Sequence, residues 1–259
     1  MKFGLTVRLF VCFFCCSVLL NACSKKDDKN CPTNFRVTAS KLTPTVGETV
    51  TLSASPERFN YVWNGPLNFH EVQTSGASSI TIDKIKINQS GWWKGSLTGT
   101  GCSVLVDSVY IDVKYRQGTP SCSLTDNQVS GTGIPNTQAT SIRKFFDNTW
   151  NAMSLHASGS FGSPTYTFLF NSYNGRTEPK DGLYTTQDIQ SFNQFQDADM
   201  IYGQCQYGSY FFKTQPGQTI YVSHVGGKLR IAMCGVKMSG DNGNSVMVTS
   251  TFSGQVTEN

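Results

Sequence analysis

Beyond residue 30, the chain is a series of short segments in which apolar and polar residues alternate, separated by turn-forming residues. Segment 47–54 is typical, because Val50, Leu52 and Ala54 alternate with polar residues, and Pro56 follows the run. Alternation with a period of two places every second side chain on the same face of a strand, and proline cannot continue a central strand. Because such segments recur along the chain, the sequence predicts an all-β protein.

The first 22 residues have the pattern of an export signal. Lys2 and Arg8 provide a basic start, and residues 9–20 form an apolar run interrupted by Ser17. This run of about 12 residues is too short to span a bilayer as a helix, which needs about 20 residues. It matches the hydrophobic region of a signal peptide, so we expect residues 1–22 to be removed.

The leader ends in the sequence LNAC, residues 20–23. It resembles the lipobox of bacterial lipoproteins, in which small residues precede a cysteine that is lipidated and becomes the new N-terminus. The resemblance implies lipid attachment at Cys23 and a membrane partner held through that lipid, since each buried CH₂ contributes about 0.8 kcal/mol. An ordinary signal peptide followed by a chance cysteine is the alternative.

Residues 23–30 are polar and charged, so we expect a solvated tether that forms no packed core. Within it, Lys26-Asp27-Asp28 resembles the surface-export signal of Bacteroidetes lipoproteins, a lysine followed by two acidic residues. This resemblance implies an outer-membrane lipoprotein exposed on the cell surface. A tether without an export signal is the alternative.

The expected mature chain is nearly neutral. Its net charge falls from +4 to +2 when Lys2 and Arg8 leave with the leader. No basic patch suggests a nucleic-acid partner, and no acidic block suggests ion buffering. A composition rich in Ser, Thr, Gly, Asn and aromatic residues is typical of an extracellular β protein.

Five cysteines remain beyond Cys23, namely Cys31, Cys102, Cys122, Cys205 and Cys234. They show no CxxC spacing and no histidine cluster accompanies them, so we expect no metal site and no cofactor. In an oxidising compartment they should pair. Because five is an odd number, one cysteine is left over or pairs outside the chain.

Two segments resemble immunoglobulin-like (Ig-like) domains. Residues 61–66, YVWNGP, are similar to strand C of bacterial cell-surface Ig-like modules, and residues 82–95 are similar to the corner between strands E and F. The resemblance implies an Ig-like β-sandwich over residues 31–115. It also implies that Cys31, before strand A, pairs with Cys102 in the F–G loop, because both lie at one end of such a sandwich.

The chain departs from the Ig pattern in its core. Ala54 and Gly95 stand where many Ig domains carry the disulfide between the sheets, and Trp93 takes the place of the corner tyrosine. We therefore expect the corner hydrogen bond from a phenol to be lost. We also expect Trp63 and Trp93 to fill the core over the two small residues.

Strand alternation also predicts a surface. If the two tryptophans of the core face inward, then Val62, Trp92 and Lys94 face outward on one sheet. An exposed tryptophan beside a cation can stack a sugar ring or anchor a protein partner. Contact with the second domain, or an incidental exposed aromatic residue, is the alternative.

Residues 116–120 read as a linker, and residues 121–259 as a second antiparallel β-sandwich or barrel. Its clearest signal is a hairpin over residues 220–233 with a Gly-Gly turn, and a second hairpin follows across residues 240–244. This half is loosely similar to the C-terminal modules of uncharacterised Bacteroidetes lipoproteins. We prefer pairing of Cys122 with Cys234, and pairing of Cys122 with Cys205 is the rival.

No catalytic motif is present in the sequence. Asp197-Ala198-Asp199 and Gly240-Asp241-Asn242-Gly243 hint at calcium without a full ligand set, and turn chemistry explains the second. Glu57, Glu71, Glu178 and the aspartates would form a glycosidase pair only through folding. The leading hypothesis is a non-catalytic binding or adhesion module for a glycan or a protein. A structural or accessory subunit of an outer-membrane complex is the alternative, and a hydrolase with an unseen carboxylate site comes third.

Overall fold

The computed structural model describes most of the chain after the leader. It covers residues 32–57, 59–73, 77–98, 103–171, 178–194, 197–241 and 246–259. Strands dominate these residues, and the predicted all-β class is confirmed. Residues 1–31, with the lipid site Cys23, lie outside the described part, as do Cys31 and Cys102 of the predicted first-domain disulfide. No helix of the described residues is both long and apolar enough to cross a membrane.

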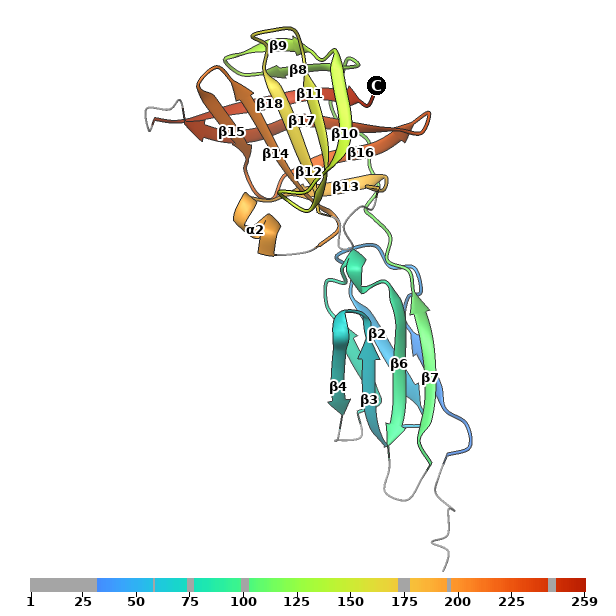
Figure 1. Cartoon of the computed structure of the whole chain (residues 1–259). Coiled ribbons are helices and arrows are strands. Elements are labelled where there is room, and N and C mark those ends of the chain that lie inside the picture. Colours follow the sequence, from blue (N-terminus) through green and yellow to red (C-terminus); the bar gives the residue numbers. More distant parts are fainter. Residues whose placement is uncertain are drawn as a thin grey trace, which may run out of the picture.

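The first domain is a sandwich of two antiparallel sheets (Figure 1). Its described strands are β1 (Arg36–Ala39), β2 (Val50–Ser55), β3 (Asn60–Gly65), β4 (Phe69–Gln73), β5 (Ser79–Ile82), β6 (Gly91–Thr98) and β7 (Leu105–Ile111). One sheet has the order β1-β2-β5 and the other β4-β3-β6-β7. This is the order A-B-E and C′-C-F-G of immunoglobulin sandwiches, so the predicted Ig-like fold is confirmed.

The core of the first domain follows from the alternation along its strands. Tyr61, Trp63, Trp93 and Leu97 lie fully buried between the sheets. The Trp93 indole N–H donates a hydrogen bond to the Gln89 carbonyl at 3.2 Å. The corner hydrogen bond expected to be lost is thus replaced by one from an indole, which reaches the backbone four residues upstream.

Each core tryptophan requires a glycine opposite it. A Cβ atom on Gly95 would lie 2.7 Å from Val37 Cγ2 and 3.3 Å from Trp63, and one on Gly65 would lie 2.5 Å from the Trp93 ring. The expected contact between Trp63 and Gly95 is therefore present. Trp93 instead packs against Gly65, a contact that was not predicted. Gly65 lies two residues beyond Trp63 on β3 and therefore faces the same side of the sheet.

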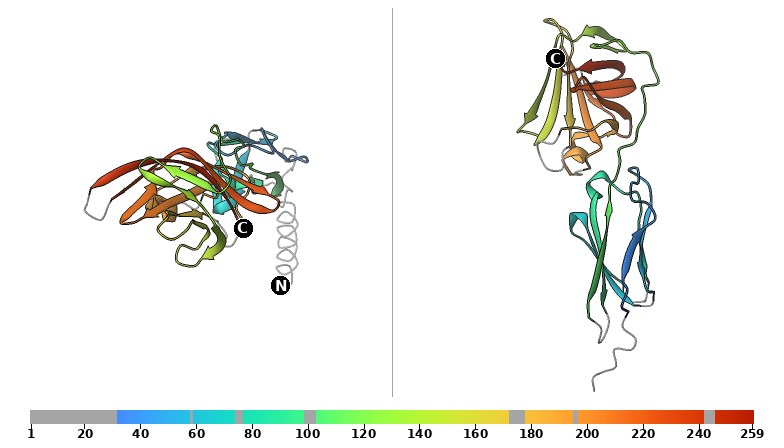
Figure 2. Two further views of the ribbon diagram at one scale, coloured as in Figure 1. Left: turned by 90° about the horizontal axis from the view of Figure 1, so that it is seen from above. Right: turned by 90° about the vertical axis from the view of Figure 1, so that its right-hand side faces the viewer.

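The second domain is built on one sheet of eleven strands (Figures 1 and 2). Its strands are β8 (Gln128–Gly131), β9 (Ile134–Gln138), β10 (Ser141–Asp147), β11 (Ala152–Ser158), β12 (Thr165–Phe170), β13 (Gly182–Thr186), β14 (Met200–Tyr207), β15 (Tyr210–Thr214), β16 (Thr219–Val225), β17 (Lys228–Asp241) and β18 (Met247–Thr257). The main order is β10-β11-β12-β14-β13-β16-β17-β18-β8-β9, and β15 pairs with β14 and β17.

This sheet curls around a large hydrophobic core, which takes side chains from both of its ends, including Ile142 of β10 and Ile134 of β9. The chain end closes the curl, because the Asn259 backbone N–H donates to the Ile142 carbonyl at 3.3 Å. Of the two predicted alternatives, sandwich or barrel, the structure therefore takes the barrel-like one.

One pair of strands departs from the predicted antiparallel arrangement. β13 and β14 pair in parallel, with Thr185 opposite Met200. Parallel neighbours need a crossover connection rather than a tight turn, and the short helix α2 (Ile189–Gln194) lies in that connection. Neither the helix nor the crossover was predicted from the sequence.

A disulfide ties the start of the second domain to its longest strand. Cys122 is bonded to Cys234, with an S–S distance of 2.01 Å, and this is the pairing preferred from the sequence. Cys234 sits where the register of β17 against β18 shifts, between Met233 and Val236. Cys205, the rival partner, is buried as a free thiol, and burial raises its pKa to about 12, so it stays protonated and unreactive.

The segment between the domains attaches to the second domain. The Leu183 N–H of β13 donates to the Arg116 carbonyl at 2.7 Å, and the Arg116 guanidinium donates to Thr185 Oγ1 at 2.7 Å. The rings of Tyr115 and Tyr184 lie 5.4 Å apart. The start of the expected linker is therefore bound to β13 by these contacts.

Candidate binding surface

Side chains that point away from the core of the first domain line the four-stranded sheet β4-β3-β6-β7. We call this surface the outer face, and it lies toward the viewer in Figure 1, in front of β2. Its residues are His70 and Val72 on β4, Val62 and Asn64 on β3, Trp92, Lys94 and Ser96 on β6, and Val106, Ser108 and Tyr110 on β7. They alternate with the buried residues of the same strands.

The outer face brings together the three residues predicted from alternation. Trp92 is 59% exposed and Lys94 is exposed, while Val62 is half-buried beside them. The register places Lys94 opposite Asn64 of β3, and Val62 opposite Ser96 of β6. The structure thus agrees with the predicted orientation of all three side chains.

An aromatic pair stands at one end of the outer face. Trp92 of β6 lies opposite Tyr110 of β7, with ring centroids 5.3 Å apart and an angle of 71° between the rings. Such edge-to-face pairs are favourable, and here the contact fixes the indole while both rings remain largely in solvent. Sequence reasoning missed Tyr110, although the register of the two strands would have identified it.

A mostly apolar row crosses the sheet farther along the outer face. Val72, Val62, Ser96 and Val106 are successive partners across the four strands. Val72 is 51% exposed and Val106 is 60% exposed. The polar row of His70, Asn64, Lys94 and Ser108 separates them from the aromatic pair. Single exposed apolar residues are ordinary on protein surfaces, so the aromatic pair remains the more distinctive feature of this face.

An open hollow of about 330 Å³ lies beside Trp92. It is lined by Asn64, Gly65, Pro66, Trp92 and Lys94. Sequence reasoning found Trp92 and Lys94 but missed the other three. Asn64 and Gly65 end β3 and Pro66 begins the turn that follows, and the path of that turn depends on the left-handed conformations of Leu67 and Asn68.

The base of the hollow is held by close packing. Gly65 lies directly on the buried Trp93 ring, and a Cβ atom on Gly91 would approach Pro66 Cγ to 3.1 Å. Leu67 takes a left-handed backbone conformation with φ of 59°, which turns the chain back into β4. The shape of the hollow is therefore set by the core beneath it.

The charge of the outer face is positive. Lys94 carries the one permanent charge among its residues, and none of them is a carboxylate. The nearby acids alternate to the other side of the sheet: Glu71 bonds to Gln73, and Asp107 accepts a hydrogen bond from the Val37 backbone N–H at 2.8 Å. In the described part of the chain, no ion pair joins Lys94 to an acid.

A second charged group lies on the second domain. Lys144 of β10 contacts Glu178 at 2.6 Å and Glu258 at 3.0 Å, and His224 of β16 contacts Asp181 at 2.6 Å and Glu178 at 3.2 Å. Glu178 therefore pairs with two cations. Since Glu57 and Glu71 belong to the first domain, the structure places the three glutamates of the hydrolase hypothesis on two different domains.

Burial and charge oppose each other within this group. Burial lowers the pKa of His224, but its hydrogen bonds to Asp181 and Glu178 outweigh that effect, and the pKa is raised overall. Burial likewise raises the pKa of Glu178, while Lys144 and His224 lower it by more, so that it is lowered overall. Each charged side chain of this group thus lies beside a partner of opposite charge that stabilises its charged form.

Asp197 and Asp199, two of the aspartates that hinted at calcium, lie at the junction of the domains. Asp197 is 8% exposed and pairs with Lys86 of the first domain at 3.0 Å. Burial, followed by the charge of Asp197, raises the pKa of Asp199. Across the residues that the structure describes, no three acidic, histidine or cysteine side chains converge to hold a metal ion.

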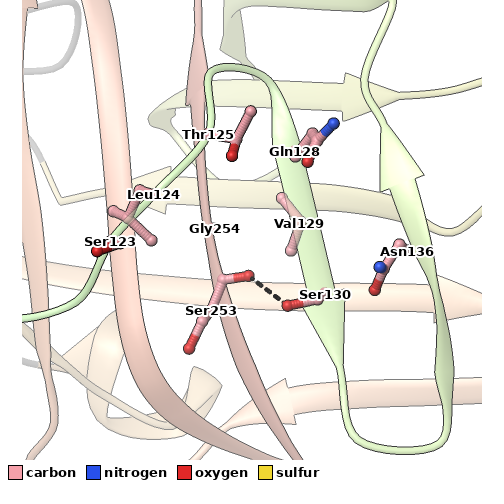
Figure 3. A pocket seen from close by; sticks show the side chains of 9 residues that line it. All are labelled: Ser123, Leu124, Thr125, Gln128, Val129, Ser130, Asn136, Ser253 and Gly254. Carbon is pink, nitrogen blue, oxygen red and sulfur yellow. Dashed lines mark hydrogen bonds between the residues drawn. The ribbon is translucent and has the colours of Figure 1, made fainter.

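A polar recess on the second domain is smaller than the hollow. Figure 3 shows it between segment 123–125 and strands β8 and β18. Its volume is about 140 Å³, and the Ser130 hydroxyl on its wall donates to the Ser253 carbonyl at 3.2 Å. Small-molecule sites usually enclose about 300–1,000 Å³, so the hollow beside Trp92 is the better candidate.

Solved structures with some similarity to the chain include the following three. The Ig1 domain of mouse SynCAM 2 is 16% identical, with 30% of this chain and 93% of that domain covered and a TM-score of 0.24. Murine CEACAM1b is 11% identical, with coverage of 74% and 100% and a TM-score of 0.27. A mouse coronavirus receptor-binding domain complexed with its murine receptor gives 10% identity, coverage of 87% and 96%, and a TM-score of 0.26.

Neither a protein-family model nor a curated protein matches the chain. All three TM-scores are low, so the Ig-like assignment of the first domain depends on its strand order and not on these similarities.

Proposed function

We propose that the protein is a cell-envelope lipoprotein that binds an extracellular glycan or protein through the outer face of its first domain, without catalysis. The observation that carries this proposal is the exposed Trp92–Tyr110 pair with the exposed cation Lys94 on the same face. Tryptophan and tyrosine are enriched at binding sites, because each combines a large apolar area with a directed polar contact.

Location at the cell envelope is supported by the N-terminal sequence and by the cysteines. The leader ends at Cys23, and the tether that follows carries the lysine and two aspartates associated with surface export. The bond between Cys122 and Cys234 suits an oxidising compartment outside the cytoplasm.

The binding proposal is tested with the whole mature chain, residues 23–259, on immobilised glycans and on cell-surface protein fractions. We expect ligands that are captured by the natural chain and lost in Trp92→Ala. Trp150→Ala is the matched control, since Trp150 is also exposed, at 38%, but belongs to the second domain. Capture that survives Trp92→Ala, or no capture at all, would contradict the proposal.

Lipid attachment and location at the cell surface are tested separately, in cells fed with labelled palmitate. We expect label on the natural chain and none on Cys23→Ala, and we expect protease added to intact cells to release peptides of the first domain. Label that persists in Cys23→Ala would refute the lipid site, and full protection from protease would refute surface display. A stable membrane partner that is retained by Trp92→Ala would instead favour the accessory-subunit alternative.

A further inference from the structure

The hollow beside Trp92 presents an apolar plane next to hydrogen-bond donors. Trp92 supplies the plane, held edge-to-face by Tyr110 and still 59% exposed. The C–H groups of one face of a pyranose ring pack well on an indole, because both surfaces are flat and weakly polar. This feature favours a sugar ring as the occupant of the hollow.

The polar side chains of the hollow are donors rather than acceptors. The Asn64 side-chain oxygen accepts the hydrogen bond of His70 Nδ1 at 2.9 Å, which leaves the Asn64 NH₂ group free to donate. Lys94 of β6, which lies opposite Asn64 of β3, adds an ammonium group with three N–H donors. The lining thus holds two donor side chains and no carboxylate.

Such a donor-rich lining discriminates between neutral and acidic ligands. Sugar hydroxyls donate as well as accept, and a site for a neutral sugar satisfies them with both kinds of group. A carboxylate only accepts, so its two oxygens match Lys94 and the Asn64 amide. Because none of the outer-face residues named above is acidic, they would not repel the carboxylate of a ligand.

We propose that the hollow binds an acidic sugar residue of a glycan, with its ring on Trp92 and its carboxylate at Lys94 and Asn64. This inference rests on the proposed binding function of the outer face and specifies its ligand class. The tight base of the hollow, where Gly65 touches Trp93, means that little of the site has to be ordered on binding.

The test uses oligogalacturonate, a hyaluronan hexasaccharide and sialyllactose, each with its carboxyl methyl ester, titrated calorimetrically into the whole mature chain. For at least one of the three, we expect the free acid to bind more tightly than its ester. Lys94→Met should weaken the acid about fivefold, the size of one solvent-exposed ion pair, and leave the ester unchanged. Added salt should reduce the same preference.

Two matched controls separate the site from general effects on the protein. Lys237→Met removes an exposed strand lysine of the second domain and should change neither affinity. Trp92→Ala should weaken acid and ester alike by about tenfold, whereas Trp150→Ala should not. Unchanged melting temperatures of the variants show that each domain is still folded.

The outcomes distinguish this inference from the proposed function. Equal binding of acid and ester, no binding of any of the three glycans, or no effect of Lys94→Met would overturn the acidic-sugar inference. If an acidic peptide or another protein binds and is lost in Trp92→Ala, the inference fails while the binding function stands. If no ligand responds to Trp92→Ala, both fail.

Discussion

Two glycines in the first domain are matched to two tryptophans. Trp63 lies over Gly95 and Trp93 over Gly65, and both rings are fully buried. Many Ig domains join their sheets by a disulfide at the positions of Ala54 and Gly95, whereas here the buried tryptophan rings fill the space between the sheets. The stability of the sandwich therefore depends on the absence of side chains at the two glycines.

Gly95→Ala should test this dependence. Its Cβ atom would lie 2.7 Å from Val37 and 3.3 Å from Trp63, inside a core that cannot expand without strain. We expect the free energy of unfolding to fall by about 1–3 kcal/mol in denaturant titrations. Ser96→Ala, the next residue on β6 but on the outer face, should change it by less than about 0.5 kcal/mol. Equal effects of the two substitutions would contradict the packing described.

The orientation of single residues was predictable from the sequence, but their partners were not. Alternation along β3 and β6 was enough to place Val62, Trp92 and Lys94 on one surface. It did not indicate that Pro66 would complete a hollow around Trp92, because that contact depends on a turn with left-handed residues. Periodicity determines which face a side chain is on, whereas turn geometry determines what it meets.

Strands β10 and β16 are held together through charged side chains instead of a backbone ladder. Lys144 of β10 and His224 of β16 both contact Glu178, and Lys144 also contacts Glu258 next to the chain end. The C-terminus lies beside β10 in Figure 1. This group joins the two parts of the sheet that meet when it curls.

The group should make the stability of the second domain depend on pH. The raised pKa of His224 means that its contribution is fully present below its ordinary pKa and is lost as pH rises through the raised value. The lowered pKa of Glu178 means that its contribution is present above its ordinary pKa and is lost as pH falls through the lowered value. Both contributions are therefore present together between the two ordinary pKa values, at weakly acidic pH.

His224→Gln should remove the first contribution alone. We expect its free energy of unfolding to differ from that of the natural protein more at pH 5.5 than at pH 8.5, by up to about 1 kcal/mol for such partly exposed pairs. His156→Gln is the matched control. Burial, followed by the charge of Arg143, lowers the pKa of His156, so this substitution should not cost more stability at pH 5.5 than at pH 8.5. A pH-independent difference for His224→Gln would show that the histidine is not charged in the folded protein.

Hairpins were predictable from local sequence, and the closing of the sheet was not. The Gly226-Gly227 turn between β16 and β17 has both residues at positive φ, as its sequence indicates. The parallel pairing of β13 with β14 involves residues separated by a helix, and the contact of β10 with the chain end spans more than 100 residues. Such non-local pairings leave no periodic signal in the sequence.

At the scale of the whole molecule, the domains are connected by specific contacts rather than by a free linker. Tyr115 packs against Tyr184 with the two rings tilted by 31° and donates to the Ala198 carbonyl at 3.2 Å, and Lys86 pairs with Asp197 across the junction. A Cβ atom on Gly182 would lie 2.6 Å from Tyr115 Cβ, so β13 is shaped to receive the linker. The outer face therefore has a defined orientation relative to the second domain.

Tyr115→Ala should loosen this junction. The Leu183 amide, which donates to the Arg116 carbonyl, should exchange its hydrogen at least about tenfold faster, because the linker would detach locally without unfolding either domain. Tyr110→Ala, a matched tyrosine on the outer face, should leave this exchange unchanged. Equal exchange in Tyr115→Ala and in the natural protein would show that Tyr115 does not hold the linker in place.

The most direct test of the binding function is hydroxyl-radical footprinting of the whole mature chain with a captured ligand at saturation. We predict that the ligand lowers oxidation of Trp92 and Tyr110 and leaves oxidation of the exposed Trp150 unchanged. Oxidation of Trp92 and Tyr110 at the same rate with and without a saturating ligand would contradict it.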